Sequence, residues 1–183
     1  MSGCDVRVAD ASRDAEACAQ IYGYFVEHST ATFEYEAPSA VELESRIEAV
    51  TRTHEWLVAE RDGRTVGFAY ASPWNPRPAY EWSCETTIYV RNGHEGAGVG
   101  RSLYAQLTER LVQRGFRTAI GRIALPNDAS IRLHESFGYT SVGIHRHLGF
   151  KHGQWVDVLH TELQLNTTDC APLPVRPPTS SHP

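Results

Sequence analysis

A glycine-rich segment in the middle of the chain is the clearest candidate for binding chemistry. It reads Arg91-Asn92-Gly93-His94-Glu95-Gly96-Ala97-Gly98-Val99-Gly100-Arg101, after a predicted strand and before a predicted helix. Glycines let backbone N–H groups converge, and the start of a helix adds partial positive charge, so a phosphate could bind there. On these residues alone, a glycine-rich surface turn explains the segment almost equally well.

The surrounding sequence excludes two common nucleotide-binding loops. A P-loop ends in Gly-Lys-Ser/Thr, whereas Gly100 is followed by Arg101. A dinucleotide-binding loop follows an N-terminal strand and opens a strand–helix–strand array, whereas this loop lies in mid-chain after an antiparallel hairpin. If this loop binds an anion, it is therefore a site of another kind.

Three side chains outside the loop could act on a bound substrate. Glu85 stands inside an apolar, β-branched strand, and its residues alone favour a solvent-facing carboxylate over a site. His134 lies on a short predicted helix, where an imidazole bonded to the backbone is the commoner arrangement. Arg77 lies in a loop with three prolines, which suits recognition of a carboxylate or phosphinate as well as a solvated position.

A metal site is not predicted. His145 and His147 share one face of a predicted strand, and His152 follows, but no acidic residue or cysteine has metal-ligand spacing beside them. The four cysteines form no CxxC pair, so the reduced thiols of a cytosolic protein are expected.

Composition limits the classes of partner. The chain has 183 residues, of which 41% are hydrophobic and 21% charged, a balance typical of a folded domain. Its net charge of −5 comes from 17 Lys and Arg against 22 Asp and Glu, which argues against general binding to nucleic acid or anionic membranes. No apolar run approaches the ~18–20 residues of a membrane span, and no signal peptide is visible, so we expect a cytoplasmic protein.

The predicted elements place these residues around a sheet. Helical periodicity predicts helices over 14–29, from a Ser39 cap to about 50, from the glycine loop to about 114, and over 130–137. Runs of β-branched and aromatic residues predict strands over 6–8, 56–60, 65–71, 80–90, 118–125, 141–148 and 154–165. Residues 166–183 are rich in Pro, Ser and Thr, and we expect a tail that becomes ordered only on a partner.

Several short segments carry a resemblance to a known family. They are residues 56–60, 79–82, 85–90, 125–128, 132–135, 138–139 and 151–155. In this order of elements they resemble the GNAT superfamily of N-acetyltransferases and, within it, the phosphinothricin N-acetyltransferases. The resemblance covers about Val6 to Leu165, so residues 1–165 are expected to form the acetyltransferase domain.

The resemblance implies an α+β GNAT fold. Its mixed, mostly antiparallel central sheet would have about six or seven strands with a V-shaped splay, flanked by about four helices. It also implies a homodimer, with the late strands or the Pro-rich tail at or near the interface.

Acetyl-CoA is the co-substrate that the resemblance implies. The residues expected to bind it are Ile88, Tyr89, Val90, Glu95, Gly96, Ala97, Gly98, Val99, Gly100, Arg101, Asn127 and Ser130. Glu95 and Gly96 depart from the family pattern, in which the loop begins with Gln or Arg and a basic residue often follows. We expect the Glu95 side chain to turn away from the phosphates, and Arg91 and Arg101 to compensate for its charge.

Two catalytic residues also follow from the resemblance. Glu85 matches the subfamily's proposed general base, which would take a proton from the substrate amine, and desolvation is expected to make it a better base. His134 matches a position close to the departing thiol, to which its imidazole would donate. Because the amine attacks the thioester directly, no covalent acyl-enzyme is required.

The implied acceptor is a small acidic amino acid or analogue, namely phosphinothricin, methionine sulfoximine or methionine sulfone, and the first would imply herbicide resistance. The residues expected to bind it are Phe33, Trp74, Arg77, Tyr80 and Thr87. Two alternatives stay open: a GNAT enzyme for a protein N-terminus or a small amine such as a polyamine, and a non-catalytic acetyl-CoA binder. Arg77 argues against a polyamine, whereas Glu95 leaves the non-catalytic binder open.

Overall fold

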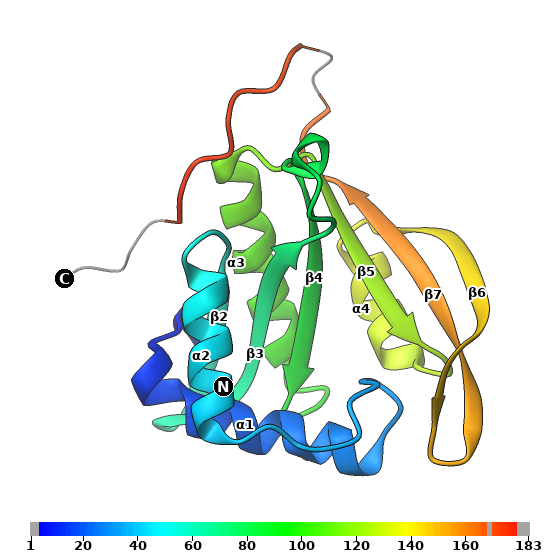
Figure 1. Cartoon of the computed structure of the whole chain (residues 1–183). Helices are drawn as coiled ribbons and strands as arrows, with labels where there is room; N and C mark the ends of the chain where they lie inside the picture. Colours follow the sequence, from blue (N-terminus) through cyan, green and yellow to red (C-terminus); the bar gives the residue numbers. More distant parts are fainter. Residues whose placement is uncertain (1–3, 168–169, 179–183) are drawn as a thin grey trace.

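Seven strands and four α-helices make up the computed structural model, which describes residues 4–167 and 170–178 (Figure 1). The elements are β1 (Asp5–Val8), α1 (Ala11–His28), α2 (Ala40–Thr51), β2 (Trp56–Arg61), β3 (Arg64–Pro73), η1 (Pro78–Tyr80), β4 (Ser83–Val90), α3 (Val99–Arg114), β5 (Thr118–Ala124), α4 (Asp128–Ser136), β6 (Thr140–Lys151) and β7 (Gln154–Gln164). The expected α+β class is therefore confirmed. Among the described residues, no helix is both long and apolar enough to cross a lipid bilayer.

The sheet parts along its middle. Its order is β1-β2-β3-β4-β5-β7-β6, and β4–β5 is the parallel pair in an otherwise antiparallel sheet. Pairing between β4 and β5 ends at Glu85 and Ile120, whereas β3 stays paired with β4 up to Val90. From Thr86 onward the β5-facing edge of β4 therefore has no strand partner, and the two strands diverge in the expected V (Figure 1).

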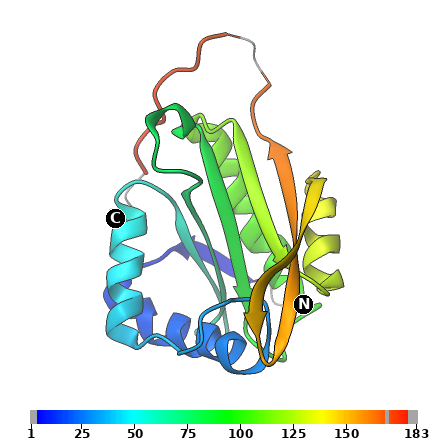
Figure 2. The same cartoon turned by 45° about the vertical axis from the view of Figure 1, so that its right-hand side comes forward.

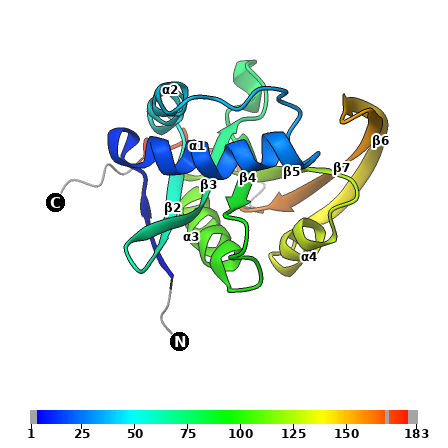
Figure 3. The same cartoon turned by 90° about the horizontal axis from the view of Figure 1, so that it is seen from below.

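Helices cover both faces of the sheet. α1 and α2 lie on one face, and α3 and α4 lie on the other (Figure 3). Side chains alternate accordingly along β2: Trp56 and Val58 pack with α1 and α2, while Leu57 and Ala59 pack with α3. Because both faces are covered there, β2 and β3 are apolar on both sides over most of their length, as their sequences predict.

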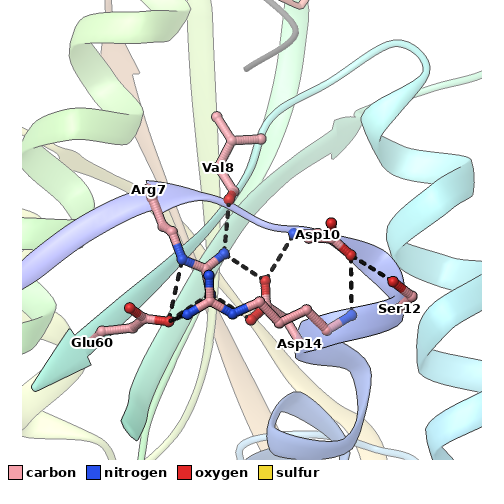
Figure 4. Close-up of polar contacts among 7 residues, drawn as sticks. Arg7, Val8, Asp10, Ser12, Asp14 and Glu60 are labelled. Carbon is pink, nitrogen blue, oxygen red and sulfur yellow. Dashed lines mark hydrogen bonds and ion pairs between the residues drawn. The ribbon is translucent and has the colours of Figure 1, made fainter. Parts of the chain in front are cut away.

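A partly buried ion-pair network fixes the start of α1 against the sheet. The guanidinium of Arg7 on β1 donates to both carboxylate oxygens of Asp14 at 2.6 and 2.7 Å, and to Oε1 of Glu60 on β2 at 2.6 Å (Figure 4). Asp14 also accepts from the backbone N–H of Asp10, the N-cap residue. Removing Arg7 would leave the buried Asp14 carboxylate without its cation, so this network is structural.

Local hydrogen bonds move two predicted element boundaries. α1 begins at Ala11 rather than at residue 14, because the Asp10 side chain accepts from the N–H of Arg13. The predicted strand over 80–90 begins only at Ser83, because Pro78 opens the 3₁₀ turn that contains Tyr80.

The β6–β7 hairpin reaches across the sheet to the loop between α1 and α2. The buried Lys151 ammonium donates to the Thr32 carbonyl at 2.8 Å, and the Tyr35 hydroxyl donates to the Phe150 carbonyl at 2.6 Å. Figure 2 shows this loop beside the end of the hairpin. Two segments far apart in sequence therefore close one end of the molecule together.

The described part of the C-terminal tail docks on its own chain. Trp82 Nε1 donates to the Leu173 carbonyl at 2.8 Å, and Arg114 Nε donates to the Arg176 carbonyl at 2.7 Å. Val175 packs against the core on the α3 side. The expectation of a tail ordered only by a partner is therefore wrong for 166–167 and 170–178, and 168–169 and 179–183 lie outside the described residues.

Candidate active site

A cleft of about 540 Å³ opens where β4 and β5 diverge. Its walls come from the end of β4, the glycine loop, the first turn of α3, the end of β5 and α4. Most of the predicted cofactor residues line it: Ile88, Tyr89, Val90, Glu95, Gly96, Gly98, Gly100, Arg101, Asn127 and Ser130. The glycine loop thus forms one wall of a cavity together with segments distant in sequence, which favours a binding site over a plain surface turn.

The first turn of α3 faces this cleft with its backbone donors free. Gly98 is the N-cap at φ 83°, a left-handed conformation that favours glycine, and it supplies no side-chain cap. The first intrahelical bond runs from the N–H of Ser102 to the Gly98 carbonyl, so the N–H groups before Ser102 lie ahead of the helical ladder. A phosphate group fits this geometry, because converging N–H groups and the helix dipole both favour an anion.

The open edge of β4 supplies the second feature of the cleft. Residues from Thr86 to Val90 have β3 on one side and no strand partner on the other. An extended ligand that carries amide groups can pair with such an edge as an added strand would. The cleft therefore fits a long ligand with a phosphate at the α3 end and amides along β4.

Glu85 stands where the two strands separate, and it is not alone. Its Oε1 accepts from Nε of Arg122 on β5 at 2.7 Å, with 15% of the Glu85 side chain and 49% of the Arg122 side chain exposed. Cys84 points into the core beside α3, so the neighbouring Glu85 points to the face that carries α1 and α2. The carboxylate is thus largely buried and ion-paired, and the sequence analysis did not predict its partner Arg122.

His134 on α4 is buried, and both of its ring nitrogens have partners. Nδ1 lies 2.8 Å from the Ser130 carbonyl, and Nε2 lies 2.9 Å from the Tyr104 hydroxyl. Because a carbonyl only accepts, Nδ1 carries the proton and Nε2 of the neutral ring accepts from Tyr104. Burial lowers the pKa of His134, although its bond to Ser130 opposes this, so the ring is neutral at pH 7.

A glycine on β5 makes room for this imidazole. A Cβ on Gly121 would lie 2.7 Å from the His134 ring and 2.7 Å from Oγ1 of Thr161. Any larger residue would push the ring away from Tyr104, so Gly121 is part of what positions the pair.

Comparison with known proteins identifies the family and the fold. A model of the acetyltransferase (GNAT) domain matches residues 8–160. The chain belongs to the GNAT acetyltransferase family. It is 39% identical to a phosphinothricin N-acetyltransferase of Streptomyces viridochromogenes, over 96% of this chain and 94% of that one. It is 30% identical to an L-methionine sulfoximine/L-methionine sulfone acetyltransferase of Salmonella typhimurium, over 88% and 94% of the two chains.

Solved structures agree with the sequence comparisons. A GNAT phosphinothricin acetyltransferase from Sinorhizobium meliloti, in complex with acetyl-CoA, superposes with a TM-score of 0.90 at 33% identity, over 96% of this chain and 97% of that one. An acetyltransferase from Salmonella typhimurium, also with acetyl-CoA, gives a TM-score of 0.88 at 29% identity, over 93% and 98%. The chain is accordingly an acyltransferase.

Two predicted cofactor residues of this acetyltransferase lie outside the cleft. The Ala97 carbonyl accepts from Nη2 of Arg61 at 2.9 Å, on the outer side of the loop. The Val99 side chain is buried in the core, where it would lie 3.0 Å from a Cβ on Gly67 of β3. Sequence position in the loop therefore does not decide which side chains face the ligand, because α3 must also pack on the sheet.

The charges of the glycine loop are arranged only partly as expected. Glu95 turns back and accepts from the N–H of Gly93 at 2.8 Å, although it still borders the cleft. Arg101 lines the cleft, with its guanidinium 5.9 Å from the centre of the Phe137 ring. Arg91 does not line it and instead donates to the Thr65 carbonyl at 3.1 Å. Arg101 is therefore the one of the two predicted cations that faces the cleft.

The predicted acceptor residues are spread over a wider area than the cleft. Thr87 lines the cleft itself, whereas Phe33 packs its ring directly over Gly149 of β6. Trp74 meets His160 edge-on at 6.2 Å between ring centres. The structure does not bring Arg77 and Tyr80 into the cleft: they lie exposed at η1, between β3 and β4.

Two cleft residues were missed by the sequence analysis. Arg122 is a charged residue inside the apolar strand β5, the same signal that selected Glu85 on β4. Tyr104 lies next to the Leu103, Leu107 and Leu111 stripe of α3 and was indistinguishable from core. No group of three or more potential metal ligands gathers anywhere in residues 4–167 and 170–178.

Proposed function

We propose that this acetyltransferase transfers the acetyl group of acetyl-CoA to the amino group of a small acidic amino acid or analogue. Phosphinothricin, methionine sulfoximine and methionine sulfone are the candidates, since relatives named for these activities match nearly the whole chain. The observation that carries the proposal is the cleft at the β4–β5 divergence, with a free helix N-terminus at one end and, on its wall, Arg122, which is paired with the Glu85 carboxylate.

The binding of acetyl-CoA rests on the fit already described. The N–H groups at the start of α3 and the Arg101 guanidinium would hold the pyrophosphate. The free edge of β4 would pair with the pantetheine amides, and Asn127 and Ser130 line the far wall. The bound thioester supplies the activated acetyl group, and the protein positions the amine against it.

Glu85 is proposed as the group that takes the proton from the amine. Its Oε1 is held by Arg122, and none of the described residues hydrogen-bonds to Oε2. An oriented carboxylate with one free oxygen at the vertex can accept an ammonium proton, as general-base catalysis requires. The reaction then needs no covalent acyl-enzyme.

His134 is proposed to act through Tyr104 at the sulfur position. Burial raises the pKa of Tyr104, which keeps its hydroxyl protonated, and Nε2 of His134 accepts its single proton until the thiolate forms. The hydroxyl would then turn that proton from Nε2 to the sulfur. A buried O–H donor stabilises negative charge that develops on sulfur. His134 is in this view a positioning residue, and Tyr104 is the donor.

A homodimer through the β6–β7 hairpin is proposed for the assembly. β6 is an edge strand, and the hairpin exposes Val142, Ile144, Leu148, Phe150 and Trp155, each at 46% or more. An exposed apolar edge of this kind favours a protein interface. Sedimentation that shows only a 20.4 kDa species at micromolar concentration would contradict the dimer.

A cytoplasmic location is proposed from the free cysteines Cys4, Cys18, Cys84 and Cys170.

A thiol-release assay with four acceptors tests the proposed reaction. Phosphinothricin and methionine sulfone should be acetylated, whereas spermidine and a Ser-Ala peptide should react far more slowly. Faster turnover of the peptide or of spermidine than of the two amino acids would show that the proposed acceptor class is wrong. Thermal stabilisation by acetyl-CoA without turnover of any acceptor would indicate a non-catalytic binder.

A further inference from the structure

We propose that Glu85 and Arg122 together recognise the α-amino-acid zwitterion, with the ammonium on Glu85 and the α-carboxylate on Arg122. The inference rests on the proposed function and narrows its acceptor to free α-amino acids. It assigns to Arg122 a role in specificity in addition to holding Oε1 of Glu85.

The pair leaves the atoms that such a substrate needs uncommitted. A single contact, Nε of Arg122 to Oε1 of Glu85 at 2.7 Å, joins the two side chains. Among the described residues, Arg122 has no other hydrogen-bond partner, so Nη1 and Nη2 remain free to donate, and Oε2 of Glu85 remains free to accept. Half of the Arg122 side chain is exposed, and it lines the cleft.

The spacing of charges in an α-amino acid matches this arrangement. Its amine nitrogen and carboxylate carbon are bonded to one carbon and lie about 2.5 Å apart. A carboxylate beside a guanidinium presents the opposite charges at similarly close range, and a guanidinium fork suits a carboxylate in particular. The site and the zwitterion each have no net charge, so neither charge is left unpaired on binding.

The neighbours of Arg122 support an anion on its free side. His160 on β7 lies directly opposite Arg122, and its Nε2 is 3.1 Å from Nδ1 of His145. Burial, followed by the charges of His145 and Arg122, lowers the pKa of His160, although Glu85 opposes this, so His160 is neutral at pH 7. Trp74 packs edge-on against His160 and shields this side of the site. A carboxylate would thus meet the Arg122 cation beside neutral rings.

The two arms of the V explain why the site lies at the vertex. Glu85 is the last β4 residue paired with β5, and its partner there is Ile120. Arg122 lies two residues beyond Ile120, where the two strands have already separated (Figure 1). The pair therefore bridges the opening between the arms. A purely structural bridge would affect every acceptor equally, and this difference provides the test.

The experiment compares one amino acid with its own primary amide. Methionine sulfone and methionine sulfone amide share the amine and the side chain, but only the first has an α-carboxylate. kcat/KM for both is measured in the wild type, Arg122→Gln, Arg122→Lys and Arg13→Gln. Arg13 pairs with Glu60 at the surface near β2, so Arg13→Gln is a matched control for the loss of one positive charge.

The inference predicts a selective loss. Arg122→Gln should lower kcat/KM for the free acid about 10- to 100-fold, the range expected for one charge-assisted pair. It should change the amide by less than about 3-fold, because the Gln amide group can still donate to Glu85. Arg122→Lys should retain part of the preference because it keeps the charge without the fork. Arg13→Gln should leave both substrates unchanged. An acetyl-CoA melting shift confirms that each variant is folded.

Other outcomes separate the inference from the proposed function. Equal losses for acid and amide in Arg122→Gln would overturn the inference and make Arg122 a structural bridge. A wild type that does not prefer the acid over its amide would overturn it as well. Turnover of peptides or spermidine, but of neither methionine sulfone compound, would overturn the proposed function itself.

Discussion

The Tyr104 hydroxyl lies 2.9 Å from Nε2 of His134, and the other nitrogen of that imidazole is held by the Ser130 carbonyl. The pair lines the cleft where β4 leaves β5, beside Thr86. Because His134 is neutral and its own N–H is committed to Ser130, the proton closest to the cleft is the one on Tyr104. We therefore propose that His134, which the sequence selects at this position, acts through Tyr104, which the sequence does not select.

Tyr104→Phe should lower kcat by about 10-fold or more while leaving acetyl-CoA affinity within about 3-fold, because only the O–H donor is lost. The orphaned Nε2 of His134 should also cost about 1–3 kcal/mol of stability. Tyr139→Phe is the matched control, since that hydroxyl contacts Thr86 in the same buried group but not His134. Similar kcat losses in both variants, measured by steady-state kinetics, would show that Tyr104 has no special role.

Glu85→Gln should reduce turnover by about 10²–10⁴ near neutral pH, the usual contribution of a positioned base. The amide oxygen can still accept from Arg122, so the shape of the site and acetyl-CoA affinity should persist. The deficit should shrink toward pH 9, where more of the substrate is already free amine. Near-normal turnover across pH 6 to 9 would place the base elsewhere.

Arg77→Ala tests whether Arg77 binds the acidic side chain of the substrate. It should mainly raise KM for phosphinothricin, by the roughly 1.5–3 kcal/mol of a charge-assisted pair, and combine additively with Glu85→Gln. Because Arg77 lies exposed at η1, outside the cleft, an unchanged KM would show that this loop does not contact the substrate.

The elements of this fold were largely predictable, whereas the direction of its side chains was not. Leu103, Leu107 and Leu111 mark α3 by spacing alone, and Gly98 and Gly115 mark its ends with left-handed backbone. Periodicity does not show that β4 leaves β5 after Glu85, because an unpaired strand edge has the same composition as a paired one. The splay was available only through resemblance to a family.

Candidates for the site could be found from sequence where a charged residue stands in an apolar strand. Glu85 is such a residue, although its role came from the family resemblance, and the same reasoning applied to β5 would have found Arg122 as a candidate. Tyr104 and Val99 show the limit: both are apolar-compatible residues near the start of α3, yet one lines the cleft and the other fills the core. Only the packing of α3 on β3 decides between them.

Glu95→Gln should tighten acetyl-CoA binding by about 2- to 10-fold at low salt, because it removes a negative charge at the edge of the anion site. The Gln oxygen can still accept from the Gly93 N–H, so the loop conformation should remain. Titration calorimetry at low and high ionic strength measures the effect, which should fade as salt rises. Unchanged or weaker binding at low salt would mean that Glu95 lies too far from the phosphates to matter.

Stability should fall in mild acid because His54 is buried. Burial, with Arg114 nearby, lowers the pKa of His54 to about 4, whereas an unfolded histidine titrates near 6.5. Between these values the unfolded chain binds more protons, so unfolding free energy decreases as pH falls from about 6.5 to about 4 and then levels off. The His54 share is about 2 kcal/mol by pH 4.5.

Urea titrations of the wild type and His54→Gln at pH 7 and pH 4.5 isolate that share. The variant should lose less unfolding free energy between the two pH values, although His134 adds a loss in the same direction to both proteins. Identical losses in the two proteins would exclude His54 as the source.

Removal of residues 168–183 should lower the melting temperature by about 3–10 °C without changing kcat. The deletion takes away the Leu173 carbonyl that Trp82 donates to, and the Arg176 carbonyl that the buried Arg114 donates to. Because these contacts lie beside the start of β4 and the end of α3, they are at the far end of both elements from the glycine loop, so kcat should not change.

Arg176→Ala is the control: its backbone keeps both bonds to Arg114, so its melting temperature should match the wild type. A truncated chain that melts like the wild type would show that the docked tail adds nothing to stability, whereas a truncated chain that loses kcat at unchanged stability would place the tail at the active site.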